Sequence, residues 1–189
     1  MKFIIEHLEH EMYEWCLIEY EHISKIVGKK NLLFTKVPKK DAPKLKKYGE
    51  VLTESVLDLK LKNACLLDPK ATQTLKPSDS FEYFIFGGIL GDYPEQGRTE
   101  KYLTSKLKNV KTRNLGTKQM STDTAVLVTK TILDGTSFEK IPFIDEPEIA
   151  LKKGRVAESI LLPYRYVAEK GKPVLNKKLL NYLKKKQDL

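Results

Sequence analysis

The stretch FIFGGILGDYPEQGRT, residues 84–99, indicates the fold of this chain more directly than any other part of the sequence. It begins as an apolar run typical of a buried strand, has glycines at positions 87, 88 and 91, and continues into a charged turn that contains Pro94. Glycine adopts backbone angles that other residues avoid, and it lets a ligand approach main-chain N–H and C=O groups closely. The stretch therefore predicts either a tight turn or the floor of a binding site, and these residues alone leave both open.

Segments that read as strands and helices alternate on both sides of this stretch. Short apolar runs predict strands at residues 3–6, 32–37, 64–67, 83–86 and 110–113. Apolar residues at helical spacing predict one helix that ends at Gly28 and another that begins at Ser121 or Thr122 and ends near Gly135. This alternation indicates an α/β fold with a largely parallel sheet flanked by helices. Ligands of such sheets bind beyond the carboxyl ends of the strands, where residues 84–99 lie.

After Gly135 the pattern is less regular. The segments IPFIDEPEI and SILLPYRYV and a basic amphipathic tail follow one another without a flexible linker. We therefore interpret residues 1–189 as a single domain, in which residues 136–189 form a C-terminal extension packed on the same core.

The composition is that of a globular protein, with 41% hydrophobic and 31% charged residues. A net charge of +9 suits an anionic partner such as RNA, but the lysines are spread along the chain, which is equally typical of an ordinary charged surface. No apolar run approaches the roughly 20 residues of a membrane span. Cys16 and Cys65 do not make a disulfide framework. We expect a cytoplasmic protein without a membrane partner.

Common motifs for nucleotides, nucleophiles and metals do not fit. GGILG lacks the spacing of the dinucleotide fingerprint, and LGTKQMS lacks the earlier glycine and the Gly-Lys-Ser/Thr order of a phosphate loop. The histidines are His7, His10 and His22, all near the N-terminus, so no Ser-His-Asp arrangement is suggested. His7 and His10 lack suitable partners for a metal, and we predict no metal site.

Two glycine-containing segments together resemble a known family. IFGGILGD, followed by TRNLGTKQMSTDTAV, resembles the paired cofactor loops of the SPOUT (α/β-knot) methyltransferases. The sequence resembles one subfamily in particular, through the stretches MKFIIEHLE, CLLDP, FGGILGDYP, RT, RNLG and IPFIDEPEI. The best-known member of this subfamily is a SPOUT protein-arginine methyltransferase that modifies a ribosomal protein, and the subfamily is also labelled SAM-dependent RNA methyltransferase. The resemblance covers residues 1 to about 166 and implies a SPOUT-type α/β knot with a C-terminal deep trefoil knot.

The resemblance also implies S-adenosylmethionine as the cofactor, with its adenine held largely by main-chain groups. Glycines would clear space for the ring and sugar, and leucine and methionine side chains would form apolar walls. Asp92 would bind the ribose or the amine of the cofactor, or alternatively cap the next turn. The implied cofactor-binding residues are Leu67, Phe86, Gly87, Gly88, Ile89, Leu90, Gly91, Asp92, Asn114, Leu115, Gly116, Gln119 and Met120.

An arginine acceptor stays protonated in proteins, so carboxylates are needed to orient it and to take a proton as its nitrogen attacks. Asp145 and Glu146 in IPFIDEPEI are the candidates for this catalytic role, and acids on a solvated turn are the alternative. Arg98 is a further candidate, either binding an anionic group of substrate or cofactor or pairing with one of these acids. The sequence leaves these alternatives open.

The leading hypothesis is an S-adenosylmethionine-dependent methyltransferase that acts on an arginine of a ribosomal protein. One alternative is a SPOUT methyltransferase acting on rRNA or tRNA, which the positive charge favours. A second alternative is a knotted RNA-binding module without catalysis. For the oligomeric state, the resemblance favours a monomer over a homodimer formed through the knot.

Overall fold

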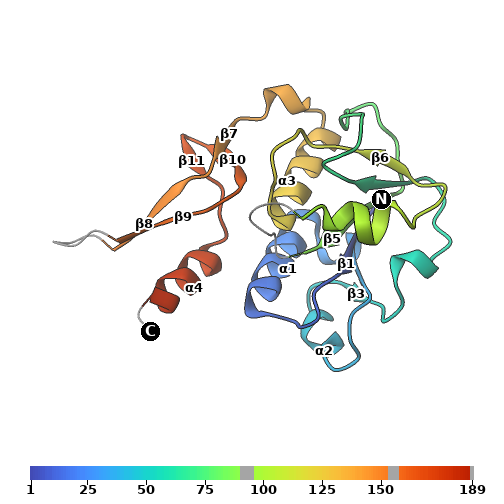
Figure 1. Ribbon diagram of the computed structural model, residues 1–189, viewed down its shortest axis with the longest axis horizontal. Coiled ribbons are helices and arrows are strands. Elements are labelled where there is room, and N and C mark those ends of the chain that lie inside the picture. The colour runs from blue at the N-terminus through green and yellow to red at the C-terminus, as the bar shows by residue number, and fades with distance from the viewer. Residues whose placement is uncertain (90–95, 153–157, 188–189) are drawn as a thin grey trace.

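The structure, a computed structural model, describes residues 1–89, 96–152 and 158–187. Its centre is a six-stranded sheet in the order β3-β2-β1-β5-β4-β6, in which every neighbouring pair is parallel (Figure 1). The strands are β1 (Lys2–His7), β2 (Leu32–Thr35), β3 (Glu50–Val51), β4 (Ala64–Leu67), β5 (Tyr83–Gly88) and β6 (Lys111–Arg113). The parallel α/β fold predicted from the alternating pattern is confirmed, and the trefoil knot stays a prediction.

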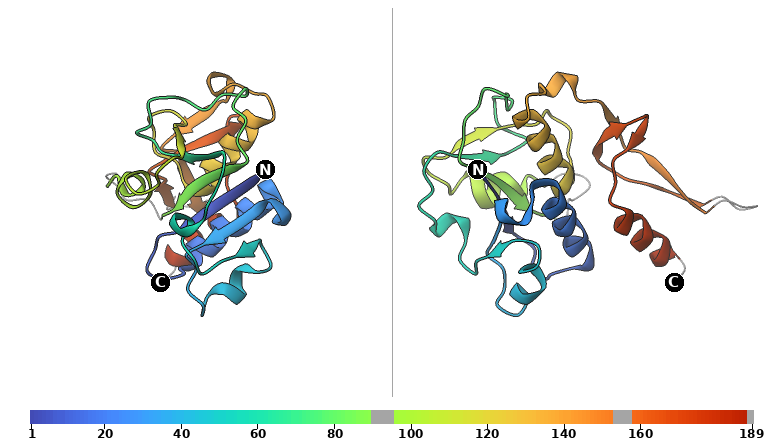
Figure 2. Two further views of the ribbon diagram at one scale, coloured as in Figure 1. Left: turned by 90° about the vertical axis from the view of Figure 1, so that its right-hand side faces the viewer. Right: turned by 180° about the vertical axis from the view of Figure 1, so that it is seen from behind.

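The inner strands read as continuous apolar runs because both faces of the sheet are covered. On one face, α1 (Glu14–Val27) and α3 (Thr122–Leu133) lie side by side over a core that includes Phe3 and Phe84 (Figures 1 and 2). On the other face, the short helices η2 (Val56–Asp58) and η3 (Glu100–Thr104) pack over Ile4 and Ile85. Two further short helices, η1 (Lys29–Asn31) and α2 (Ala42–Leu45), lie in the connections between the first three strands.

The helix ends follow the local signals in the sequence. α1 ends at Gly28, which has a φ of 81° and whose amide donates to the Ser24 carbonyl at 2.9 Å. Ser121 has the extended backbone of an N-cap residue at the start of α3. Its hydroxyl makes no capping bond and instead donates to Asp123 Oδ1 at 2.7 Å. The first residues of α3 therefore form a hydrogen-bonded polar cluster that includes Ser121 and Asp123.

The chain beyond α3 forms a separate layer. A three-stranded antiparallel sheet lies next to α3, a hairpin extends outward from this sheet, and the last helix contacts α1 (Figures 1 and 2). Its elements are η4 (Phe138–Lys140), β7 (Phe143–Asp145), β8 (Glu148–Lys152), β9 (Glu158–Leu161), β10 (Arg165–Glu169), β11 (Lys172–Pro173) and α4 (Lys177–Gln187).

This C-terminal segment contacts α1 through a small apolar cluster of its own. Ile18 of α1 packs with Leu179 and Tyr166, and Asn176 Nδ2 donates to the Ile18 carbonyl at 3.0 Å. The ring of Trp15 meets the ring of Tyr182 edge-on, with centroids 6.0 Å apart. Burying these side chains, together with the buried hydrogen bond from Asn176, fixes the segment against the helix.

The helices in the described part of the chain are all too short or too polar to cross a membrane.

Candidate active site

A pocket lies at the carboxyl edge of the sheet, where β4, β5 and β6 end. Its walls come from the last residues of β4 and β5, from the segments that follow β4, β5 and β6, and from the first turn of α3. The lining residues are Leu67, Asp68, Pro69, Phe86, Gly87, Ile89, Gln96, Gly97, Arg98, Thr99, Leu115, Gly116, Lys118, Gln119, Met120, Thr122 and Ala125. The structure thus brings together the two glycine-containing segments that the sequence pattern indicates.

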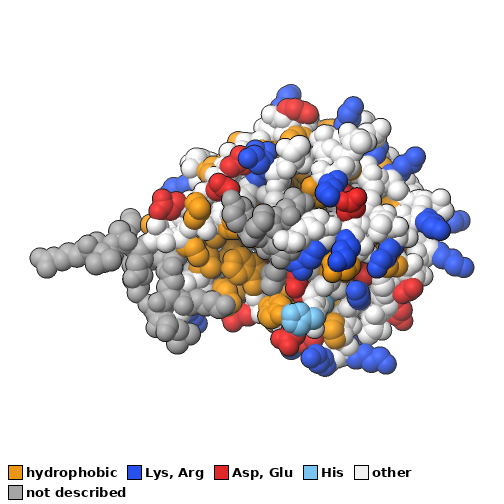
Figure 3. Space-filling model, in the orientation of Figure 1, with side chains coloured by type: hydrophobic (Ala, Val, Ile, Leu, Met, Phe, Trp, Pro, Cys, Tyr) orange, Lys and Arg blue, Asp and Glu red, His pale blue; other side chains and the backbone are white. Residues whose placement is uncertain are grey.

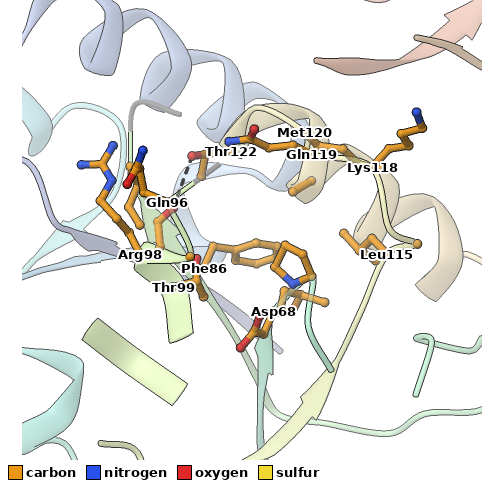
Figure 4. A pocket seen from close by; sticks show the side chains of 17 residues that line it. Asp68, Phe86, Gln96, Arg98, Thr99, Leu115, Lys118, Gln119, Met120 and Thr122 are labelled. Carbon is orange, nitrogen blue, oxygen red and sulfur yellow. Dashed lines mark hydrogen bonds between the residues drawn. The ribbon is translucent and has the colours of Figure 1, made fainter. Parts of the chain in front are cut away.

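One side of the pocket is polar, and the other combines apolar side chains such as Leu115 with Lys118 and Gln119 (Figure 4). Figure 4 shows Gln96 and Arg98 on one side of the pocket and Leu115 on the other, with Phe86 between them. The Thr122 hydroxyl lies near the polar side and donates to the carbonyl of Gly87 over 3.4 Å. An elongated ligand with an apolar aromatic end and a charged end would match these walls.

Gly87 and Gly88 have different roles. Gly87 lines the pocket, and a Cβ placed on it would lie 3.1 Å from the tip of Ile89 and 3.4 Å from the Thr99 hydroxyl. Gly88 does not line the pocket, because successive residues of a strand face opposite sides. A Cβ on Gly88 would instead lie 2.5 Å from the hydroxyl of Tyr20. The absent side chain clears pocket space at Gly87, whereas at Gly88 it makes room for α1.

The second glycine-containing segment is held by Asn114, which does not itself line the pocket. Asn114 Nδ2 donates to the Ala71 carbonyl at 2.7 Å, and its Oδ1 accepts from the Gly116 amide at 3.0 Å. Gly116 has a φ of 79°, and a Cβ there would lie 2.7 Å from the ring of Phe138. Asn114 is therefore a residue that shapes the segment around Leu115, which is buried in the pocket wall.

Leu67, Ile89, Gln119 and Met120 also line the pocket, as the resemblance implied. Leu90, Gly91 and Asp92, which the resemblance also implied as cofactor-binding residues, lie outside the described residues.

Asp68 is a lining residue that was not expected from the sequence. It is 3% exposed, its Oδ2 accepts from the Thr104 hydroxyl, and its Oδ1 accepts from the Lys70 amide at 2.9 Å. These bonds tie the end of β4 to η3. Its position directly after a predicted buried strand, in CLLDP, is the signal that points to it.

Arg98 reaches from the pocket wall to a second residue that was not expected from the sequence. Its Nη1 donates to Glu9 Oε1 at 3.0 Å, and the two side chains are 22% and 9% exposed. From the sequence, we expected an anionic ligand or the acids of the IDEPE turn as the partner of Arg98. Glu9 lies two residues beyond the end of β1. As with Asp68, its place just past the carboxyl end of a strand is the signal that could have found it.

Asp145 and Glu146 do not line the pocket. Both Asp145 oxygens accept from the Arg165 guanidinium, at 2.6 and 2.9 Å, and these bonds lower the pKa of Asp145. Glu146 is exposed and has a φ of 47°. The IDEPE turn is connected to the pocket only through Arg165, which binds Asp145 and whose amide donates to the carbonyl of Gln119 at 2.9 Å. The catalytic role of these two acids stays a prediction.

Two buried acids, Glu19 of α1 and Asp123 of α3, lie near the first turn of α3. Glu19 is 6% exposed and accepts from Trp15 Nε1 at 2.7 Å. Burial and the neighbouring Asp123 carboxylate raise the pKa of Glu19 well above its ordinary value. Asp123 pairs with His22 Nδ1 at 2.7 Å. This cluster supports Thr122 from behind and takes no part in the pocket wall itself.

Within the described residues, no group of three or more His, Cys, Asp or Glu side chains is arranged to hold a metal ion.

Comparison with known proteins gives consistent matches along the whole chain. A family model described as protein arginine N-methyltransferase SFM1-like matches residues 2–189. The protein arginine N-methyltransferase SFM1 of Saccharomyces cerevisiae is 42% identical over 205 residues, which cover 98% of this chain and 95% of the relative.

Solved structures agree. The yeast arginine methyltransferase SFM1 complexed with SAM superposes with a TM-score of 0.88 at 40% identity, covering 100% of this chain and 92% of that one. The dual specific Trm10 of Thermococcus kodakaraensis gives a TM-score of 0.55 at 16% identity, covering 74% of this chain and 96% of that one, and shares the fold.

Proposed function

Because the chain belongs to the SFM1-like family of protein arginine N-methyltransferases, we propose that it methylates an arginine of a ribosomal protein, with S-adenosylmethionine as the methyl donor. The family assignment confirms the resemblance drawn from FGGILGDYP and RNLG. The enzyme class and the cofactor follow from the 42% identical relative, a protein arginine methyltransferase, and from the yeast structure complexed with SAM.

The pocket is the observation that carries this function. Its apolar walls, from Leu67, Phe86 and Leu115, suit an adenine ring, and the missing side chain of Gly87 leaves room beside them. Gln96, Arg98 and Thr122 supply polar groups on the other side for the amino-acid part of the cofactor. When bound, S-adenosylmethionine supplies a methyl group on a positively charged sulfur. The residues of this chain then align the acceptor and exclude water from the reacting atoms.

The choice of a ribosomal protein rests on the subfamily resemblance and on charge. A substrate that lies beside RNA presents phosphates near its arginine, and a net charge of +9 favours approach to such a surface. Figure 3 shows Lys and Arg side chains spread over much of one face of the molecule. The long-range field would bring the enzyme to the particle, while local groups at the pocket select the acceptor atom. We place this reaction in the cytoplasm.

We also propose that the enzyme acts as a monomer. The C-terminal segment covers α1 with Leu179 and Leu183, so this part of the helix is already buried within one chain. Sedimentation at micromolar concentration should give a mass close to 21.7 kDa, whereas a mass near twice that value would establish a dimer.

The test of the function is the fate of a labelled methyl group. Purified protein, labelled S-adenosylmethionine and ribosomes from the same source are incubated, and the product is digested separately with ribonuclease and with protease. Label that survives ribonuclease, is released by protease and is recovered as methylarginine supports the proposal. Label released by ribonuclease would establish an RNA methyltransferase instead, and no transfer despite cofactor binding would favour a non-catalytic RNA-binding module.

A further inference from the structure

Glu9 lies next to the pocket, and the pairing of β1 with β5 determines this position. β1 and β5 are parallel neighbours with His7 opposite Gly88, and the Leu8 amide donates to the Gly88 carbonyl at 3.1 Å. Glu9 therefore follows β1 at the same edge at which Ile89 follows β5 and lines the pocket.

The carboxylate of Glu9 is shielded from water and already holds a guanidinium. Its side chain is 9% exposed, and Arg98 Nη1 donates to its Oε1 at 3.0 Å. Arg98 belongs to the polar side of the pocket, beside Gln96 (Figure 4). Glu9 thus lies near the end of the pocket that suits the charged part of the cofactor, and not near the apolar end at Leu115.

The Glu9 carboxylate also influences two buried groups in the first turns of α1. Burial raises the pKa of the Cys16 thiol to about 12, and the charges of Glu19 and Glu9 contribute to the shift. Burial also raises the pKa of the Tyr20 hydroxyl, again with a contribution from Glu9. These contributions place the Glu9 carboxylate close to the first turns of α1 as well as to Arg98.

Three other acids near the site, all within the part of the chain that the structure describes, have partners of a different kind. Asp68 accepts from Thr104 and from a backbone amide. Asp145 is bound by both arms of the Arg165 guanidinium. Glu19 is buried behind α3 and bonds to Trp15. Glu9 differs from these three carboxylates because its partner is an arginine of the pocket wall.

We propose that Glu9 is the carboxylate that binds the acceptor guanidinium, and that Arg98 fixes its orientation. This inference rests on the proposed function, because it assigns the acceptor subsite of the same pocket. A carboxylate offers about four lone-pair directions on two oxygens and can accept from two guanidinium groups at once. Glu9 then holds the acceptor arginine by charge-assisted hydrogen bonds with its terminal nitrogen facing the donor methyl group.

The reaction balances with Glu9 as the proton acceptor. A nitrogen–carbon bond forms as the carbon–sulfur bond breaks, and the electron pair of the broken bond stays on sulfur, which becomes a neutral thioether. The acceptor nitrogen gives one proton to a Glu9 oxygen, and that proton passes to water when the product leaves. The methylated guanidinium keeps its single positive charge.

The experiment compares Glu9→Gln with Glu11→Gln, which changes an acid two residues further along the same loop. Two quantities are measured: methyl transfer to the ribosomal protein fraction, and the affinity of the protein saturated with S-adenosylhomocysteine for N-acetylarginine methylamide. We expect Glu9→Gln to lower the turnover by about 30-fold or more, as expected for losing a charge-assisted contact in a shielded pair. Its affinity for the arginine amide should fall at least about tenfold. Glu11→Gln should match the wild type in both.

Thermal melting and cofactor titration accompany each variant. Glu9→Asp keeps the charge but moves the carboxylate back by one methylene group, so its turnover should also fall. This second variant tests the inference even if Glu9→Gln does not fold. Glu9→Gln or Glu9→Asp with wild-type turnover and arginine affinity would overturn the inference while leaving the proposed function intact. A wild-type enzyme that binds no arginine amide and labels RNA would instead overturn the proposed function, and the Glu9 assignment with it.

Discussion

Gly88 at the end of β5 faces Tyr20 of α1 so closely that a Cβ on the glycine would lie 2.5 Å from the tyrosine hydroxyl. Tyr20 cannot easily move aside, because it is 2% exposed and its hydroxyl pairs with His7 Nδ1 at 2.9 Å. The next glycine toward the N-terminus, Gly87, faces the pocket. The two adjacent glycines of β5 therefore have different roles: Gly88 allows α1 to pack against the sheet, and Gly87 leaves space for a ligand.

The paired variants Gly87→Val and Gly88→Val should separate these roles. Gly87→Val should fold, because its new atoms point into the pocket, and its affinity for S-adenosylmethionine should fall by about 10-fold to 200-fold. Gly88→Val should fail to fold or melt far lower, and even Gly88→Ala should lose about 1–3 kcal/mol from overpacking against Tyr20. Calorimetric titration and urea unfolding measure the two effects. A stable Gly88→Val protein that has lost cofactor binding would move Gly88 into the binding site.

The Glu21 carboxylate links α1 to the C-terminal helix and should make stability depend on acid. Hydrogen bonds from Lys178, Lys25 and Tyr48 lower the pKa of Glu21 from an ordinary value of 4.5 to about 2, with the contribution of Lys178 the largest. A lowered pKa in the folded state stabilises the protein above pH 4.5, and that contribution is lost as the pH falls toward about 2.

Glu21→Gln should therefore lower the free energy of unfolding at pH 7 by up to about 1 kcal/mol, as for a pair at the surface. The difference from the wild type should shrink between pH 4.5 and pH 2. Glu14→Gln, an exposed acid on the same helix, is the control and should show little effect. Urea unfolding over this pH range is the measurement, and a difference that stays constant with pH would contradict the assignment.

Glu19 should have the opposite pH dependence. Its pKa is raised by burial and by Asp123, so between its unfolded and folded pKa values the unfolded chain releases a proton that the folded protein keeps. The free energy of unfolding of the wild type therefore falls as the pH rises above about 4.5. Glu19→Gln cannot ionise, and its amide oxygen can still accept from Trp15 Nε1.

We expect the stability of Glu19→Gln relative to the wild type to increase from pH 5 to pH 8. Unfolding curves at the two pH values test this, and curves that keep the same separation would show that Glu19 is ionised in the folded protein.

The acids of the IDEPE turn give a test of the sequence-based catalytic assignment. Neither lines the pocket, Asp145 is bound to Arg165, and Glu146 is exposed. Asp145→Asn and Glu146→Gln should therefore keep turnover within about twofold of the wild type, as for surface substitutions of about 0.5 kcal/mol. A marked loss of turnover in Glu146→Gln at unchanged cofactor affinity would restore that residue as the group that orients the acceptor.

Much of the fold and part of the site follow from local patterns in the sequence. The stretches FII, LLF, ACLL and FIF of β1, β2, β4 and β5 are continuous and apolar, because a parallel sheet is covered on both faces. The glycines near residue 87 and the NLG segment are also local signals, and they indicate a pocket. Both place accessible backbone at the ends of strands that meet at one edge of the sheet. β3 has only two residues, and no such pattern marks it.

Only the tertiary structure decides which side chains meet at that edge. Arg98 and Glu9 are 89 residues apart, and their contact depends on β1 lying beside β5 in a particular register. The same register and the packing of α1 turn Gly88 away from the pocket, and the pairing of β7 with β10 engages Asp145 with Arg165. Charge and residue type make a carboxylate available for catalysis. Its partners are set by strand order, register and helix packing, which are cooperative properties of the whole fold and leave no local signal in the sequence.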